Sequence, residues 1–156
     1  MQTETMYTTR VEQYVRADRP AVYRALVDAD AIAYWRVPDG MTSTMHEFSP
    51  HEGGSFRVSL TYDRPESAGK SSAHTDTFHG RFVELVRDSR VVEEFTFETA
   101  DPALAGTMTM TTTLSDAPGG TTVTVVHEGM PDAVPPADNE LGTRMALAKL
   151  ARLVES

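Results

Sequence analysis

The sequence contains no cysteine, which excludes disulfide bonds, thiolate chemistry and cysteine-ligated metal. No stretch approaches the ~20 consecutive apolar residues of a transmembrane helix, and residues 1–6 lack the apolar segment of a signal peptide. Basic residues are scarce and scattered, with 14 Lys and Arg against 23 Asp and Glu and a formal net charge of −9. Nucleic acid and anionic membranes reward clustered basic side chains. We therefore expect no nucleic-acid partner, no membrane insertion and a cytoplasmic location.

The 156 residues are enough for one domain with a substantial core. No internal repeat or linker divides them, so we expect a single domain over residues 1–156, with residues 1–6 flexible. Eight Met, six Phe, five Tyr and one Trp supply bulky and adaptable apolar side chains. Such residues suit the wall of an irregular pocket, and they suit an ordinary core equally well.

Alternating β-branched and aromatic residues predict seven strands, near residues 7–15, 42–48, 55–62, 77–85, 91–98, 106–114 and 121–128. Asp18 before Arg19 and Pro20 indicates a helix start, because Asp caps the helix and proline near the first turn loses no needed donor. Two short helices are predicted over 21–27 and 29–35, and an amphipathic helix over 138–155. The pattern predicts an α+β fold in which an antiparallel sheet is covered on one face by the last helix.

The inner face of that sheet can be assigned in part. In the sixth strand one row is mostly apolar (Met108, Met110, Thr112 and Leu114) and the opposite row is threonine, which we place on the solvated side. In the seventh strand Val123, Val125 and His127 share the inner face. The last helix is expected to face the sheet with Thr143, Ala146, Leu147, Leu150, Leu153 and Val154, and the solvent with Arg144, Lys149, Arg152 and Glu155.

Four segments carry a resemblance to a known family. They are Trp-Arg-Val-Pro-Asp-Gly-Met at 35–41, His-Glu-Gly-Gly-Ser-Phe-Arg at 51–57, Gly-Arg-Phe-Val-Glu-Leu at 80–85, and the stretch 119–131. In this order they resemble the activator-of-heat-shock-protein-ATPase-like group of the START/Bet v 1-like (SRPBCC) superfamily. The resemblance implies a helix-grip fold, a seven-stranded antiparallel sheet gripping a long C-terminal helix over an elongated cavity. The superfamily includes lipid carriers, polyketide cyclases, hormone receptors and co-chaperone domains, so it does not select a function.

The chain departs from the family at Thr143. Family members often have Gly-Trp near the start of the last helix, whereas this chain has Gly142 and Thr143. We expect this difference to remove aromatic volume from the cavity and to add a hydroxyl group, unless a neighbouring aromatic residue fills the space.

Two titratable residues fall on the predicted inner face. His127 could act as an acid, a base or a hydrogen-bond donor in the pocket, or it could be satisfied by the following turn. Glu93 shares its strand face with phenylalanines and must find a partner there, for which Arg57 and Arg81 are candidates. A structural ion pair is the interpretation we favour for Glu93.

Metal and cofactor sites are not predicted. His74 and Asp76 share a strand face, with His79 opposite, and His46 and His51 are separated by a turn. None of these has the spacing of a known zinc site, so we expect no metal, and the sequence indicates no cofactor.

Our leading hypothesis is the binding or carriage of a small hydrophobic or aromatic molecule. The expected wall residues are Trp35, Phe56, Tyr62, Phe82, Met110, His127, Thr143 and Leu147. The second hypothesis is an enzyme of the cyclase, aromatase or hydrolase kind, with His127 as acid or base. The third is a co-chaperone-like interaction module with a chaperone partner, and a homodimer is compatible with any of the three.

Overall fold

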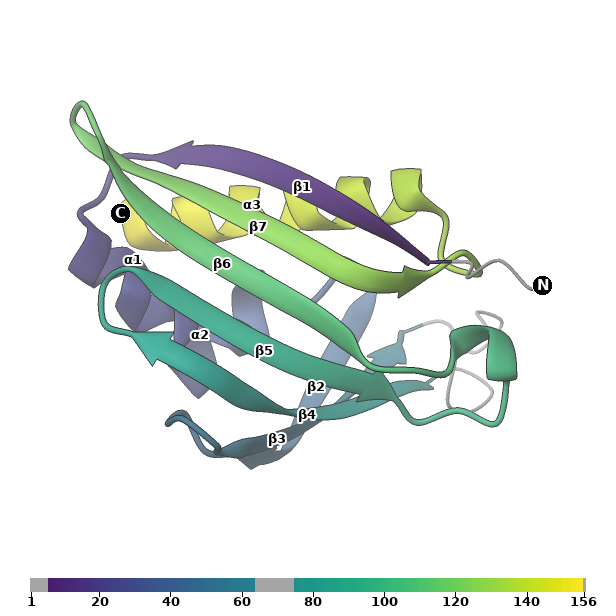
Figure 1. Cartoon of the computed structure of the whole chain (residues 1–156). Helices are drawn as coiled ribbons and strands as arrows, with labels where there is room; N and C mark the ends of the chain where they lie inside the picture. The colour runs from purple at the N-terminus through teal and green to yellow at the C-terminus, as the bar shows by residue number, and fades with distance from the viewer. Residues whose placement is uncertain (1–5, 64–74, 156) are drawn as a thin grey trace.

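The computed structural model describes residues 6–63 and 75–155. Met6 already belongs to the first strand, and residues 1–5, which we expected to be flexible, lie outside the described part. The elements follow the order strand, two helices, six strands, helix, and a short 3-10 helix lies in the connection between the fifth and sixth strands (Figure 1). The strands are β1 (Met6–Val15), β2 (Met41–Phe48), β3 (Ser55–Tyr62), β4 (Thr75–Val86), β5 (Arg90–Phe97), β6 (Met108–Ala117) and β7 (Gly120–Pro131). The helices are α1 (Arg19–Leu26), α2 (Ala29–Trp35), η1 (Pro102–Leu104) and α3 (Pro136–Glu155).

All seven strands form one antiparallel sheet in the order β1-β7-β6-β5-β4-β3-β2. The first two strands in the chain therefore lie at opposite edges of the sheet, and α1 and α2 make the connection between them (Figure 1). α3 runs beside β1 and also packs against α1 and α2. This is the predicted helix-grip fold.

The start of α1 confirms the predicted cap at Asp18, and Asp28, which was not predicted, caps α2 in the same way. Asp18 accepts a hydrogen bond from the amide of Ala21 at 3.0 Å, and Asp28 accepts one from the amide of Ala31 at 2.8 Å. Each carboxylate satisfies a donor that the first helical turn would otherwise leave open. These two caps fix where α1 and α2 begin, and so where Trp35 at the end of α2 lies.

β7 is longer than predicted because glycine and proline do not end it. Gly129 has φ of +73°, and the register with β1 shifts there, so that two residues of β7 lie opposite one of β1. An extra residue of this kind is a β-bulge, which bends the strand and moves the following side chains to the other face. His127 and Met130, three positions apart, consequently both point to the inner face, where both are buried.

The inner face of the sheet agrees with the predicted alternation. Met108, Met110, Thr112 and Leu114 of β6 are all buried, and so are Val123, Val125 and His127 of β7. No helix among the described residues is long and apolar enough to cross a membrane.

The inner face of α3 was predicted less accurately. Thr143, Leu147 and Leu150 are buried as expected, but Leu153 is 37% exposed, and Ala151, which we had not assigned, is buried. At 100° per residue, Ala151 lies about 40° around the helix from Leu147, whereas Leu153 lies about 120° away. The predicted apolar face was therefore too wide on one side.

Candidate functional site

A cavity of about 280 Å³ lies between the inner face of the sheet and helices α2 and α3. Apolar side chains provide most of its wall, and a small number of polar groups interrupt it. The polar or charged residues on the wall are Arg36, Ser43, Glu93, His127, Asp138, Asn139 and Thr143. An apolar space with few fixed polar groups is typical of a small-molecule site.

All six phenylalanines of the chain line this one cavity. They are Phe48, Phe56, Phe78, Phe82, Phe95 and Phe97, and they come from four neighbouring strands, β2 to β5. Successive rings meet edge to face, with centroid separations between 5.3 Å (Phe56 and Phe82) and 6.3 Å (Phe56 and Phe78). Edge-to-face pairs are a favourable arrangement of aromatic rings, so these contacts hold the wall in one shape.

Trp35 closes the cavity on the helical side. It is buried at the end of α2, and its indole Nε1 donates a hydrogen bond to the carbonyl oxygen of Ala25 in α1 at 2.9 Å. From the sequence, Trp35 could cover the pocket entrance or only pin the two short helices to the sheet. In the structure its side chain lines the cavity, belongs to the core that the helices share with the sheet, and joins the two helices.

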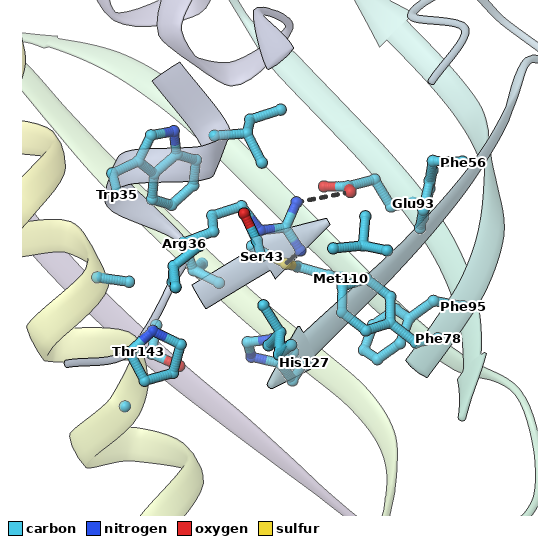
Figure 2. Close-up of a pocket in the computed structure, with 18 of the residues that line it drawn as sticks. Trp35, Arg36, Ser43, Phe56, Phe78, Glu93, Phe95, Met110, His127 and Thr143 are labelled. Atoms are coloured by element: carbon cyan, nitrogen blue, oxygen red, sulfur yellow. Dashed lines mark hydrogen bonds and ion pairs between the residues drawn. The ribbon is translucent and has the colours of Figure 1, made fainter. Parts of the chain in front are cut away.

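An ion pair crosses the cavity directly beyond Trp35. Arg36 is the C-cap of α2, and its Nη1 lies 2.8 Å from Oε1 of Glu93 on β5, while its Nη2 donates to Sδ of Met110 at 3.3 Å. Figure 2 shows this pair with Trp35 and Thr143 to one side and Phe56, Phe78 and Phe95 to the other. Because both side chains are largely buried, the mutual neutralisation of their charges is what permits them to remain there.

The predicted partners of Glu93 were wrong. Arg57 pairs with Glu98, with Nε and Oε2 2.8 Å apart, and Arg81 pairs with Glu94, both away from the cavity. Arg57 and Arg81 lie on the opposite sheet face from Glu93, since their register partners on the adjoining strands are His79 and Glu94. Arg36 reaches Glu93 because it extends from a helix end over the inner face, which strand alternation does not reveal.

His127 lies beside this ion pair, next to the ring of Phe95. Its ring centroid is 6.5 Å from that of Phe95 at nearly a right angle, and the residue is 9% exposed. Burial, and then the positive charge of Arg36, lower the pKa of His127 from 6.5 to about 4. The imidazole is therefore neutral at physiological pH. Among the described residues, its Nδ1 is the buried side-chain nitrogen or oxygen atom that lacks a hydrogen-bond partner.

The exposed members of the wall mark where the cavity reaches the surface. Ala33 of α2, Pro38 of the following loop, and Asp138 and Gly142 of α3 line the cavity and are exposed. The mouth therefore lies between the α2–β2 loop and the first half of α3. Farther along α3, Lys149 joins the same two elements, because its Nζ donates to the carbonyl oxygen of Val37 at 2.6 Å.

Seven of the eight residues predicted for the wall lie on it. They are Trp35, Phe56, Phe82, Met110, His127, Thr143 and Leu147. Tyr62 is not on the wall, although Phe56, Val58 and Leu60 of the same strand are. It has the same alternation as those residues but is the last residue of β3, beyond the end of the cavity. Arg36 and Ser43, which no pattern in the sequence indicated, also line the cavity.

The hydroxyl of Thr143 does not act as we expected. It donates a hydrogen bond to the carbonyl oxygen of Asn139, one turn earlier in α3, at 2.8 Å. The hydroxyl proton is thus used within the helix. What Thr143 offers the cavity is chiefly the space left by its small side chain.

The histidines outside the cavity make separate contacts. His46 bonds the hydroxyl of Ser59 at 2.8 Å, His79 pairs with Glu98 at 2.9 Å, and His74 lies outside the described residues. Within residues 6–63 and 75–155, three or more His, Asp or Glu side chains nowhere gather in a way that could hold a metal ion.

Comparison with known proteins identifies the family. Residues 16–155 match the family described as "Activator of Hsp90 ATPase homolog 1-like protein". The chain belongs to this family. The comparison with curated proteins finds no match.

Several solved structures share the fold. A protein of Chromobacterium violaceum is 33% identical, with a TM-score of 0.84 over 96% of this chain and 97% of its own. A protein of Rhodobacter sphaeroides is 20% identical, with a TM-score of 0.76 over 95% and 92% of the two chains. An AHSA1-like protein of Aeromonas hydrophila is 20% identical, with a TM-score of 0.70 over 96% and 92%. These three structures share one architecture with this chain over nearly its whole length.

Proposed function

We propose that the protein binds or carries a small hydrophobic or aromatic molecule in the cavity described above. The observation that supports this most directly is that all six phenylalanines and the single tryptophan surround one space of about 280 Å³. An unfilled apolar space costs stability in proportion to its volume, so a chain selected for folding alone would be expected to fill it. The volume lies just below the roughly 300–1,000 Å³ of small-molecule pockets and suits a compound of one or two rings.

The electrostatics of His127 favour binding over catalysis. A general acid or base works best when its pKa is near the operating pH. With a pKa of about 4, His127 carries no proton to donate as an imidazolium at neutral pH, and as a base it is weak. Its remaining capacity is to hydrogen-bond a ligand.

The test uses Trp35 as an internal reporter. It is the one tryptophan of the chain and lines the cavity, so a ligand that enters should change its emission as well as raise the melting temperature. We expect at least one member of a panel of fatty acids, sterols and polyketide-like aromatics to do both. Absence of any response in both measurements would contradict the proposal.

A matched pair of variants locates the binding. Phe78→Leu changes a residue on the wall, and Tyr62→Leu changes an aromatic residue beyond its end. We expect the affinity of a ligand found in the panel to fall several-fold in Phe78→Leu and to stay near the wild-type value in Tyr62→Leu. Equal effects of the two substitutions would place the ligand elsewhere.

Stoichiometric recovery of a chaperone in a pull-down would instead favour the co-chaperone hypothesis.

A further inference from the structure

The two strand neighbours of His127 are engaged elsewhere. His127 lies opposite Met110 on β6 and opposite Thr9 on β1. The sulfur of Met110 accepts a hydrogen bond from Arg36, and the hydroxyl of Thr9 donates to the side-chain oxygen of Asn139. The adjacent aromatic residue is Phe95, whose ring carries no nitrogen or oxygen atom for a conventional hydrogen bond. The protein therefore surrounds this imidazole with groups that do not satisfy it.

The two ring nitrogens differ in their surroundings. Nδ1 is enclosed and has no partner among the described residues. Nε2 also makes no hydrogen bond there but is not enclosed, and the residue lines the cavity. A buried N–H without an acceptor is rarer in proteins than a buried acceptor without a donor. The proton of the neutral ring is therefore expected on Nε2, which makes this atom a donor directed at the cavity.

The charges around the cavity oppose an anionic ligand. Arg36 and Glu93 neutralise each other inside, and Asp138 at the mouth adds a negative charge to a chain whose net charge is −9. A carboxylate that entered would meet no uncompensated positive charge, unless it displaced Glu93 from Arg36. An unpaired charge in an apolar space is strongly disfavoured.

We infer that the ligand of this cavity is an uncharged aromatic compound with a carbonyl-type acceptor, to which the Nε2–H of His127 donates a hydrogen bond. The aromatic part lies against the phenylalanine wall, and His127 determines which substituent is accepted. This inference rests on the proposed function, since it specifies the ligand of the same cavity.

Three two-ring probes of matched shape test it. Each is a naphthalene with one substituent at position 2, and the three substituents have nearly the same size. The acetyl group offers a neutral hydrogen-bond acceptor, the isopropyl group offers none, and the carboxylate carries a negative charge. Their affinities are measured by isothermal titration calorimetry at neutral pH. We expect 2-acetylnaphthalene to bind about tenfold more tightly than 2-isopropylnaphthalene, because a tenfold difference in affinity corresponds to the free energy of about one neutral hydrogen bond. We expect 2-naphthoate to bind most weakly.

Variants of His127 identify the donor. In His127→Leu the preference for the acetyl over the isopropyl compound should disappear, whereas His127→Gln, which keeps an N–H donor, should retain part of it. Thr112→Val changes a buried polar residue of the same sheet face that does not line the cavity, and it should preserve the wild-type order. Far-ultraviolet circular dichroism checks that each variant is folded.

The outcomes separate the two proposals. Tightest binding of 2-naphthoate would show that Arg36 receives an anion and would overturn the inference while leaving cavity binding intact. Equal affinities for the acetyl and isopropyl compounds in the wild type, or an acetyl preference that persists in His127→Leu, would also overturn it. If none of the three probes bound, and no member of the ligand panel changed the Trp35 emission or the melting temperature, the proposed function itself would be contradicted.

Discussion

At the scale of single residues, His127 links the site to stability at acid pH. Its pKa is about 4 in the folded protein, because of burial and the nearby charge of Arg36, against 6.5 for an ordinary histidine. Below pH 6.5 the unfolded chain binds a proton that the folded protein does not, so this residue lowers the free energy of unfolding as the pH falls toward 4. The full difference corresponds to on the order of 3 kcal/mol, reached below both pKa values.

We predict that His127→Leu removes this part of the acid sensitivity. Between pH 7 and pH 5 the wild type should lose about 2 kcal/mol more than the variant, measured by denaturant unfolding at each pH. Thr112→Val, at a buried position of the same sheet face that carries no titratable group, is the control and should keep the wild-type dependence. An identical pH dependence for all three proteins would show that His127 is not held neutral by its surroundings.

Thr143 leads to a second prediction, about volume. Because its side chain borders an open space, Thr143→Trp should fill part of the cavity with an indole ring. We expect the free energy of unfolding to rise by roughly 1–3 kcal/mol, which is several degrees in melting temperature, and ligand uptake to weaken. Thr143→Val, which replaces the hydroxyl with a methyl group of similar size, should leave uptake largely unchanged. A folded Thr143→Trp protein with undiminished uptake would show that this position does not border the binding space.

The site was predictable where strand alternation decides which side chains point inward. Phe56, Phe82, Met110 and His127 could be placed on the wall from their positions in strands alone. Arg36 could not, because a long side chain at a helix end can reach in several directions, and its partner Glu93 is 57 positions away in the sequence. The contact depends on how α2 lies over the sheet, which is a property of packing rather than of local pattern.

At the scale of elements, Lys149 shows how α3 is tied to the α2–β2 loop. We had assigned it to the solvated face of the helix, but its side chain is only 14% exposed. Its Nζ donates to the carbonyl oxygen of Val37, lies 3.6 Å from the carboxylate of Asp39, and lies over the ring of Tyr34 at 5.2 Å. The apolar stem of lysine covers the helix contact while the ammonium group satisfies the end of the loop.

We predict that Lys149→Met destabilises the protein by about 1–3 kcal/mol, because methionine keeps the apolar stem but leaves the carbonyl of Val37 without its charged donor. Arg152→Met, at an exposed position on the same helix, should change stability by less than about 0.5 kcal/mol. Chemical denaturation of both variants measures the difference. If the two substitutions had equal effects, the contacts of Lys149 would contribute no more than those of an exposed charge.

The bounds of the elements were predictable to different degrees, depending on how clearly the residues at their ends mark a stop. β3 and α2 were predicted at their observed bounds, because turn or capping residues stand at both ends. β7 was predicted to stop at Glu128, since Gly129 and Pro131 ordinarily interrupt strands. In the sheet, Gly129 forms the bulge and Pro131 ends the pairing opposite Met6. Glycine and proline are thus ambiguous signals near the end of a strand, where a bulge can accommodate them.

At the scale of the whole molecule, the cavity follows from where the long helix lies. α3 packs along β1 and against α1 and α2, whereas the phenylalanine wall belongs to β2 through β5. The sheet curves, and its two edges are formed by β1 and β2, so a helix held beside β1 cannot also fill the space over the far strands (Figure 1). The apolar residues of those strands therefore face a space that the chain leaves open.

The same arrangement has a consequence for unfolding. One continuous apolar core includes Val22 of α1, Trp35 of α2, Val125 of β7 and Leu150 of α3. Elements that share one core are expected to lose their packing together, and small domains commonly unfold in a single cooperative step. Trp35 reports on the helical side of the cavity, and far-ultraviolet circular dichroism reports on the sheet and helices as a whole.

We predict that these two signals give the same midpoint in a denaturant titration, and that a cavity ligand shifts both midpoints equally. A ligand at a concentration 100 times its dissociation constant should add about 2.7 kcal/mol to the free energy of unfolding, without a change in the slope of the transition. If Trp35 emission changed at a lower denaturant concentration than the circular dichroism, α1 and α2 would separate from the sheet before the rest unfolds. The roof of the cavity would then be a unit of lower stability, and ligand binding should shift the Trp35 transition more than the other.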